Sequence, residues 1–210
     1  MSRFAEYERT NEMRSLKDLV KPKNTSEISM NEKRFYTDRL MLRICTKKDA
    51  PLVLSFYDKN LEEFAKYEPL PMLETRTLSF HEQCLDFEEK EFSEMKEVRF
   101  FLFKKDNPME IIGTVSCRNI RHAFYASAEI GYKMDARFRR QGYMSEAISF
   151  MLDYVKKVHN LHRVEAYVMP DNEASLNLLT GLGFIKEGYL HDKLCLDNVW
   201  YDHVLLTKLI

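Results

Sequence analysis

The sequence predicts a mixed α/β domain, and three observations carry this prediction. Several short segments alternate apolar and polar side chains, which is typical of half-buried strands. Longer segments repeat apolar residues at spacings of three and four, which is typical of amphipathic helices. In chain order these segments give two helices, an antiparallel meander, and then strand–helix–strand–helix–strands, an order that suits a sheet covered by helices.

The chain has 210 residues, enough for one domain with an appendage. Residues 1–35 are predicted to form an N-terminal extension, partly helical or disordered, because this stretch is polar and charged apart from one rough apolar helical stripe. Residues 36–210 are predicted to form the domain. It begins with a strand in FYTDRLMLRICT, where Leu40, Leu42 and Ile44 alternate.

Helical patterns follow over residues 48–67 and 74–95, separated by the segment EPLP. Two strands, EVRFFLFKKDN and EIIGTVSCRNI, are predicted to be joined by a turn at residues 106–108. The aromatic side chains of this region are expected in the core and not on a base-stacking surface. They are Phe100, Phe101, Phe103, Phe124 and Tyr125.

The second half begins with the strand SAEIGYKMD, followed by a helix from about Met144 with a continuous apolar stripe. The next strand, HRVEAYVMP, is followed by a short helix in DNEASLNLLTGLGF. That helix is expected to be capped by Asp171 or Asn172 and ended by Gly183. The tail is predicted to form a hairpin that turns at residues 197–198.

Composition excludes several functional classes. The net charge of −1 argues against general nucleic-acid binding, and no apolar run approaches the length of a membrane span. The four cysteines form no CxxC pair, so we expect reduced, mostly buried thiols in a cytoplasmic protein. The histidines show no metal-ligand spacing, so no metal is expected. His159 and His162 lie at a helix end, where a cation is favourable.

The segment RFRRQGYMSEA places cationic and amide side chains at the start of the long helix. Helix N-termini attract anions through free N–H groups and the helix dipole, and Gly142 leaves these groups accessible. Arg139, Arg140 and Gln141 would add side-chain donors, a combination that suits a pyrophosphate. A solvated basic loop is the alternative.

These residues also match a known pattern. Over Thr37–Leu209 the chain resembles the GNAT superfamily of N-acetyltransferases, and within it the RimJ/RimL-like ribosomal-protein N-acetyltransferases. The similar pieces, in order, are TDRLMLR, IIGTVSCRNI, AEIGY, RRQGYMSEA, LHRVEAYVMPDNEAS, LLTGLGFIKEG and WYDHVLL. The resemblance implies a mixed, mostly antiparallel sheet of six to seven strands, flanked by helices, with splayed central strands. It also implies acetyl-CoA as co-substrate.

By the same resemblance, backbone amides of residues 140–144 hold the CoA pyrophosphate, and the strand Tyr132–Met134 pairs with the pantetheine arm. Asn172 contacts CoA or serves only as a helix cap. The implied cofactor-binding residues are Tyr132, Lys133, Met134, Arg139, Arg140, Gln141, Gly142, Tyr143, Met144 and Asn172.

Acetyl transfer requires a neutral amine and a thiolate that can leave. Glu129 is the candidate base, because relatives often place a carboxylate in this strand; Glu165 and Tyr167 of the next strand are alternatives. Many relatives use a tyrosine as the acid, but the corresponding residue here is Leu179. The resemblance points to Ser175 instead, for which helix capping is an equal explanation.

The predicted function is acetyl-CoA-dependent N-acetylation of a primary amine. The favoured acceptor is the N-terminal α-amine of a protein such as a ribosomal protein. A small-molecule acetyltransferase is the second hypothesis; it would act on a polyamine, amino acid or antibiotic and use an acidic pocket built from Glu62, Glu63 and Glu68. A CoA-binding interaction module without turnover is the third. Direct nucleic-acid or membrane partners are not expected, and the chain is expected to be a monomer or a homodimer.

Overall fold

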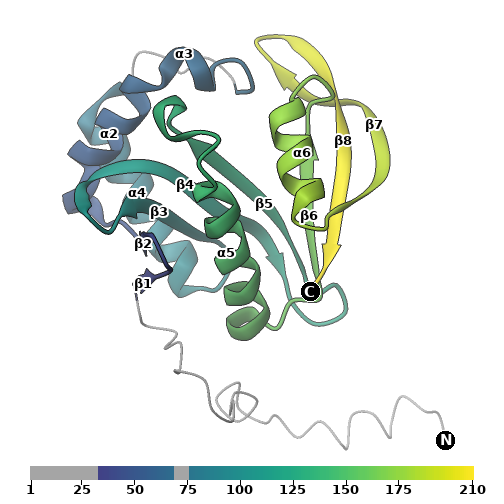
Figure 1. Cartoon of the computed structure of the whole chain (residues 1–210), viewed down its shortest axis with the longest axis horizontal. Coiled ribbons are helices and arrows are strands. Elements are labelled where there is room, and N and C mark those ends of the chain that lie inside the picture. The colour runs from purple at the N-terminus through teal and green to yellow at the C-terminus, as the bar shows by residue number, and fades with distance from the viewer. Residues whose placement is uncertain (1–32, 69–75) are drawn as a thin grey trace, which may run out of the picture. The chain divides into compact units, whose positions relative to one another are not determined.

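The computed structural model describes residues 33–68 and 76–210, so the expectation for residues 1–32 lies outside the described residues. Eight strands form one sheet in the order β1-β2-β3-β4-β5-β6-β8-β7 (Figure 1). All neighbours in it are antiparallel except β5 and β6, which are parallel. The strands are β1 (Arg34–Tyr36), β2 (Leu40–Arg43), β3 (Val98–Lys104), β4 (Asn107–Arg121), β5 (Ser127–Met134), β6 (Arg163–Val168), β7 (Ile185–Leu196) and β8 (Val199–Leu209).

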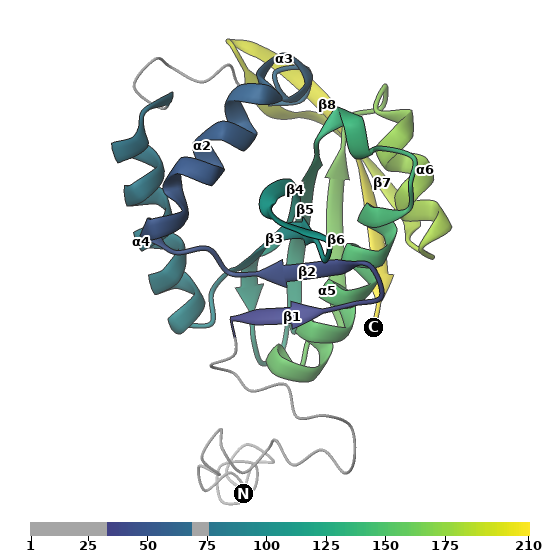
Figure 2. The ribbon, with the colours of Figure 1, turned by 60° about the vertical axis from the view of Figure 1, so that its left-hand side comes forward.

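Helices cover both faces of this sheet. One group, comprising α2, α3 and α4, lies on one side, and α5 and α6 lie on the other (Figures 1 and 2). Two short 3-10 turns, η1 and η3, precede α2 and α5. The bounds are η1 (Lys47–Asp49), α2 (Ala50–Lys59), α3 (Leu61–Phe64), α4 (Leu78–Ser93), η3 (Ala136–Phe138), α5 (Tyr143–His159) and α6 (Glu173–Gly181).

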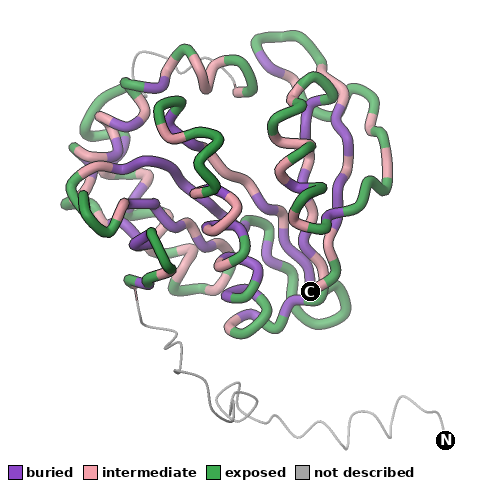
Figure 3. Tube along the Cα trace, viewed as in Figure 1, coloured by how far each residue is buried: buried purple, intermediate pink, exposed green. Residues whose placement is uncertain are grey.

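The sheet buries apolar side chains on both faces, and the burial runs through its central strands (Figure 3). Towards α5, the rings of Phe35, Phe100, Phe150 and Tyr154 pack with centroid distances of 5.0 to 6.2 Å. Towards α2 and α4, the core consists of Met41, Cys45, Ala50, Val53, Phe56, Leu85, Phe101, Phe103 and Ile111. Because β3 is packed from both sides, it is a rigid base for β4 and β5, which lead to the candidate site.

The predicted fold class is confirmed, but the sheet has eight strands and not six to seven. The extra strand arises because FYTDRLMLRICT forms a hairpin, β1 and β2, and not one strand. The Thr37 N–H donates to the Leu40 carbonyl at 3.0 Å and closes the turn between them. Ile44, expected in the alternating pattern, follows the end of β2 but is buried.

Most other element predictions agree with the structure to within a few residues. The β3–β4 turn is shorter than predicted, because Lys104 already pairs with Asn107. Asn172 caps α6 through its side chain, and Gly183 after that helix has a φ of +82°. The β7–β8 hairpin turns at Asp197 and Asn198 with φ values of 50° and 65°, as expected for a two-residue hairpin turn.

Two predictions of side-chain environment are wrong. Phe124 and Tyr125 are not core residues, because the chain turns between β4 and β5 there; they are 93% and 67% exposed. Alanines with positive φ on either side of this pair explain why the alternating pattern does not continue as a strand.

His159 is not a solvated cation at the end of α5. It is 4% exposed, and its two ring nitrogens have no hydrogen-bond partner among the described residues. Burial, with a smaller contribution from the nearby His122, lowers the pKa of His159 to about 4. The imidazole is therefore neutral at pH 7.

The four cysteines are free thiols, as expected; Cys45 and Cys117 are buried, whereas Cys84 and Cys195 are half-buried. Burial raises the pKa of the two buried thiols. Among the described residues, no helix is long and apolar enough to cross a membrane.

Candidate functional site

The centre of the sheet opens between β5 and β6. These strands pair over only three residues, from Ser127 opposite Arg163 to Glu129 opposite Glu165. Beyond that point β5 continues to pair with β4 as far as Met134, and β6 continues to pair with β8, so the two diverge (Figure 1). The backbone edge of β5 that faces β6 is thus left without a strand partner. Such an edge can bind an extended ligand through backbone hydrogen bonds.

The loop after β5 leads to the start of α5, where backbone N–H groups are free. Arg140 and Gly142 both have positive φ, at 58° and 79°, on either side of Gln141. The backbone N–H groups of residues 140–145 have no backbone acceptor among the described residues. Consecutive free N–H groups at a helix N-terminus form a cradle for phosphate oxygens, which the helix dipole also favours.

The side chains of this loop differ in part from the expectation. Arg139 forms an ion pair with Glu63, with Nη1 2.8 Å from Oε2, and the Gln141 amide donates to the Arg137 carbonyl at 3.0 Å. Arg140 is the loop arginine without a partner among the described residues. The cradle therefore consists of backbone N–H groups and the Arg140 guanidinium, while Arg139 and Gln141 hold the loop itself.

Arg39, in the β1–β2 turn, clamps the start of α5, and no sequence argument singled it out. Its Nη1 donates to the Gln141 carbonyl at 2.7 Å, and its Nε lies 2.7 Å from Oε2 of Glu146. Its guanidinium also lies over the Tyr143 ring at 4.5 Å. Burial alone would raise the pKa of Glu146, but hydrogen bonds from Thr37 and Arg39 lower it. Arg39 lies in the segment TDRLMLR and Glu146 lies in GYMSEA. No rule of residue spacing predicts a contact between segments so far apart in the chain.

Glu129 lies on the last paired rung before β5 and β6 separate, opposite Arg118 on its other side. Its half-buried carboxylate has no hydrogen bond or ion pair within the part of the chain that the structure describes. Glu165 differs, because it accepts hydrogen bonds from Arg163 at 2.7 Å and from Tyr167 at 3.0 Å. Burial alone would raise the pKa of Glu165, but these bonds lower it. Glu129 therefore differs from Glu165 in having no such partner among the described residues.

Ser175 lies in the first turn of α6, on the opposite side of the opening. Its backbone N–H donates to Oδ1 of Asn172 at 3.1 Å, so Asn172 acts as a helix cap. Its Oγ lies 2.6 Å from the hydroxyl of Tyr132 on β5, a contact that joins β5 to α6 across the opening. Leu179, at the position where relatives have a tyrosine, is fully buried.

The remaining predicted cofactor residues contribute only their backbones to β5 and to the cradle. The side chains of Met134 and Met144 are buried. Lys133 is engaged by Glu68, with Nζ 2.7 Å from Oε2, and its Nζ also lies over the Tyr57 ring.

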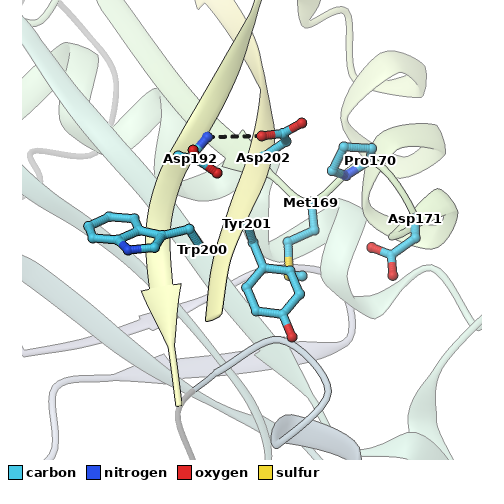
Figure 4. Close-up of a pocket in the computed structure, with 7 residues that line it drawn as sticks. All are labelled: Met169, Pro170, Asp171, Asp192, Trp200, Tyr201 and Asp202. Carbon is cyan, nitrogen blue, oxygen red and sulfur yellow. Dashed lines mark hydrogen bonds between the residues drawn. The ribbon is translucent and has the colours of Figure 1, made fainter. Parts of the chain in front are cut away.

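Two further observations concern metal ligands and pockets. Among the described residues, no group of three or more His, Cys, Asp or Glu side chains could hold a metal ion. A pocket of about 380 Å³ lies between the β7–β8 hairpin and the segment before α6 (Figure 4). None of the predicted catalytic or cofactor-binding residues lines it. Its lining is Met169, Pro170, Asp171, Asp192, Trp200, Tyr201 and Asp202.

Comparisons with known proteins agree with this geometry. The family described as an acetyltransferase (GNAT) domain matches residues 39–185. The ribosomal protein uS5-alanine N-acetyltransferase of Escherichia coli (strain K12) is 31% identical over 172 residues, covering 82% of this chain and 88% of that protein.

Solved structures are similar over most of the chain. The ribosomal-protein-S5-alanine acetyltransferase from Vibrio fischeri is 29% identical with a TM-score of 0.79, covering 85% of this chain and 97% of that one. Mycobacterium smegmatis RimJ, solved in complex with a CoA-disulfide, is 26% identical with a TM-score of 0.71, covering 81% of each chain.

Proposed function

Since the chain belongs to the GNAT family of N-acetyltransferases, which use acetyl-CoA, we propose that it acetylates the N-terminal α-amine of a protein, such as a ribosomal protein. The observation that carries the proposal is the arrangement around the opening in the sheet. A cradle of free N–H groups lies at one end of β5, and the unpaired carboxylate of Glu129 lies where β5 and β6 separate. We expect the reaction in the cytoplasm, where ribosomal proteins are made.

The residues present fit acetyl-CoA. The N–H groups of residues 140–145 and the Arg140 guanidinium would bind its pyrophosphate, and the free edge of β5 from Tyr132 to Met134 would pair with its extended arm. The thioester would then lie near the point where the strands diverge, between Glu129 and Ser175. Bound there, acetyl-CoA would supply the activated acetyl group. The protein would orient this group and take up the proton that the amine loses.

Glu129 would take up the proton that the amine loses as it attacks. An α-amine has a pKa of about 7.7–8.0, so roughly a fifth of it is neutral near pH 7.3, whereas a lysine side chain is neutral to about one part in a thousand. A single carboxylate base is sufficient for the acetylation of an α-amine and poorly suited to that of a lysine side chain. This difference favours an N-terminal acceptor.

The polyamine hypothesis receives less support. It required a cation-binding pocket formed by Glu62, Glu63 and Glu68. Glu63 pairs with both Lys66 and Arg139, and Glu68 pairs with Lys133, so cations of the protein already neutralise them. Glu62 is exposed on α3. A polyamine would have to displace these partners to bind there.

A panel of acceptors tests the proposal. We expect CoA release with a peptide that carries the N-terminus of ribosomal protein uS5. No release is expected with the same peptide acetylated at its α-amine but keeping a free lysine. Spermidine and an aminoglycoside serve as the small-molecule arm, and turnover with these alone would reject the proposal in favour of the second hypothesis. CoA binding without turnover of any acceptor would favour the non-catalytic module.

The role of Glu129 has its own test. Glu129→Gln keeps the shape of the side chain and removes its basicity, so we expect kcat to fall by about 10²-fold while the Kd for CoA is unchanged. The loss should be largest at low pH, where the least amine is neutral. Glu165→Gln is the matched control on the facing strand. An unaltered pH profile for Glu129→Gln would remove this residue from the mechanism.

A further inference from the structure

The hydroxyl of Tyr132 has a position that its expected role does not explain. Pairing with a pantetheine arm needs only the backbone of this residue, and a phenylalanine would serve equally well. Yet the Tyr132 hydroxyl crosses from β5 to α6 and meets Ser175 at 2.6 Å, a short distance for two neutral hydroxyls. The two strands make no backbone contact at this level, so the hydroxyl pair joins the two sides of the opening.

We propose that Tyr132 is a positioning residue for the leaving thiolate, and that it acts through Ser175. The Tyr132 O–H donates to Ser175 Oγ, which turns the Ser175 hydrogen outward to the CoA sulfur. Without Tyr132 the Ser175 hydroxyl would be free to rotate, and its hydrogen would point to the sulfur only part of the time. This inference rests on the proposed acetyl transfer and adds a second residue of β5 to it.

Either hydroxyl of this pair could donate, and in this proposal the Tyr132 O–H is the donor. The neighbours of Ser175 leave its hydroxyl as the group that this bond would orient. Its backbone N–H is already fixed by Asn172, so the first turn of α6 holds Cα and Cβ in place. Only the rotation of the hydroxyl remains to be set. A hydroxyl that accepts one hydrogen bond becomes a better donor in the next, so a Tyr–Ser–sulfur chain strengthens the last bond.

The chain of hydroxyls stabilises the thiolate without giving it a proton. When the tetrahedral intermediate collapses, the carbon–sulfur bond breaks and its electron pair stays on sulfur. Burial raises the pKa of Tyr132 to about 12, well above that of a thiol, so transfer from the phenol to the thiolate is unfavourable. The proton that the amine lost, held on Glu129 or passed to water, completes the CoA thiol. The net reaction is then amine plus acetyl-CoA giving amide plus CoA.

The Tyr132–Ser175 pair matters because α6 lacks the tyrosine that many relatives use as the acid. Leu179 is buried and cannot donate a hydrogen bond, so the helix lacks the hydroxyl that many relatives place there. The Tyr132 phenol approaches α6 from the neighbouring strand instead. The structure thus offers two hydroxyl groups in place of one, each contributed by a different side of the opening.

The test measures the acidity of the bound CoA thiol, which needs neither acceptor nor turnover. CoA labelled with ¹³C at the carbon next to sulfur is bound to the full chain, and its chemical shift is followed from pH 6 to 9.5. In the wild type we expect a thiol pKa below that of free CoA. Tyr132→Phe and Ser175→Ala should each raise it by about one pH unit, and the double variant should raise it no further.

Tyr154→Phe is the matched control. It also removes one buried phenol hydroxyl, but this hydroxyl has no partner among the described residues and lies in the aromatic core beneath α5. Its bound thiol should titrate as in the wild type. In turnover, Tyr132→Phe should lower kcat about 10-fold with the KM for acetyl-CoA changed less than threefold.

Each outcome decides the question. An unchanged thiol pKa in Tyr132→Phe, with or without a shift in Ser175→Ala, overturns the role of Tyr132. Equal effects of Tyr132→Phe and Tyr154→Phe also overturn it, because they would indicate loose packing and not hydrogen bonding. Failure of the wild type to bind CoA would contradict the proposed function itself, and the labelled thiol detects that separately.

Discussion

At the scale of single residues, the candidate site depends on backbone geometry more than on charged side chains. The cationic sequence RFRRQGYMSEA drew attention to its arginines, yet Arg139 is held by Glu63, and the free N–H groups form the cradle. Gly142 is the residue this geometry requires, because its φ of 79° is unfavourable for any residue with a Cβ. An added Cβ would also meet the Arg39 guanidinium at 3.2 Å.

Gly142→Val should therefore abolish CoA binding. Gly183→Val is the matched control, because Gly183 has an almost identical φ of 82° but follows α6, away from the cradle. Each variant should lose about 1–2 kcal/mol of stability from left-handed strain. Only Gly142→Val should lose CoA affinity in calorimetric titration, and equal affinities in the two variants would contradict the cradle.

His159 provides a second prediction at this scale. Its pKa is about 4 in the folded protein and about 6.5 in the unfolded chain. Above pH 6.5 both states are neutral and His159 has no effect; as the pH falls, the unfolded state binds the proton first, so stability is lost between pH 6.5 and 4. The loss approaches about 3 kcal/mol at the lower limit.

Denaturant unfolding at several pH values measures this loss. His159→Phe should flatten the decline, while His162→Gln, three residues further along the chain, should leave it as in the wild type. A decline of the same steepness in His159→Phe would show that another group causes it.

At the scale of elements, the β1–β2 turn fixes the start of α5. Thr37 and Arg39 supply three hydrogen bonds to the Glu146 carboxylate, and Arg39 supplies a fourth to the Gln141 carbonyl. These bonds hold the first turn of α5, and with it the N–H groups of the cradle, against the sheet. The turn thus supports the candidate site through its contacts with Glu146 and Gln141.

Arg39→Gln should loosen this support. We expect CoA affinity to fall roughly 10-fold, with a stability loss of only about 1 kcal/mol because the arginine is half-exposed. Arg43→Gln is the control: Arg43 also combines an ion pair, with Asp49, and an aromatic contact, with Phe103, but it lies on β2 away from α5. Equal losses of CoA affinity in both variants would argue against a specific clamp.

The element scale also shows what the sequence could predict. Periodicity predicted α5 because its apolar stripe is long, and local capping residues predicted the short α6. The β1–β2 turn was missed because it contains neither Gly nor Pro, and it is held by Glu146, a residue distant in the chain. The Tyr132–Ser175 contact was missed for the same reason, since it joins β5 to α6. Periodicity and capping residues predict where helices and strands lie and where they end. Contacts between elements distant in the chain depend on how the fold packs, and these rules do not predict them.

At the scale of the whole molecule, the buried apolar core of the described residues runs from Phe35 in β1 to Leu206 in β8. The sheet is held at one edge by β1, and Lys33 contributes to that edge by accepting a hydrogen bond from the Ile44 N–H at 2.9 Å. The Lys33 side chain also pairs with Glu89 on α4. Lys33 therefore contacts both the edge of the sheet and α4, and we expect a chain that keeps it to retain these contacts.

A chain that begins at Glu32 should therefore fold and bind CoA like the full protein. We expect its thermal midpoint to lie within about 4 °C of the full chain, because a difference of 1 kcal/mol would shift it by about 2–4 °C. A chain that begins at Leu40 is the informative comparison. It lacks β1, the ring of Phe35 in the aromatic cluster, and Arg39, so it should lose both stability and the fixed start of α5. If the chain beginning at Glu32 also lost CoA affinity, residues 1–31 would have to contribute to the cofactor site, and the predicted division into an extension and a catalytic domain would be wrong.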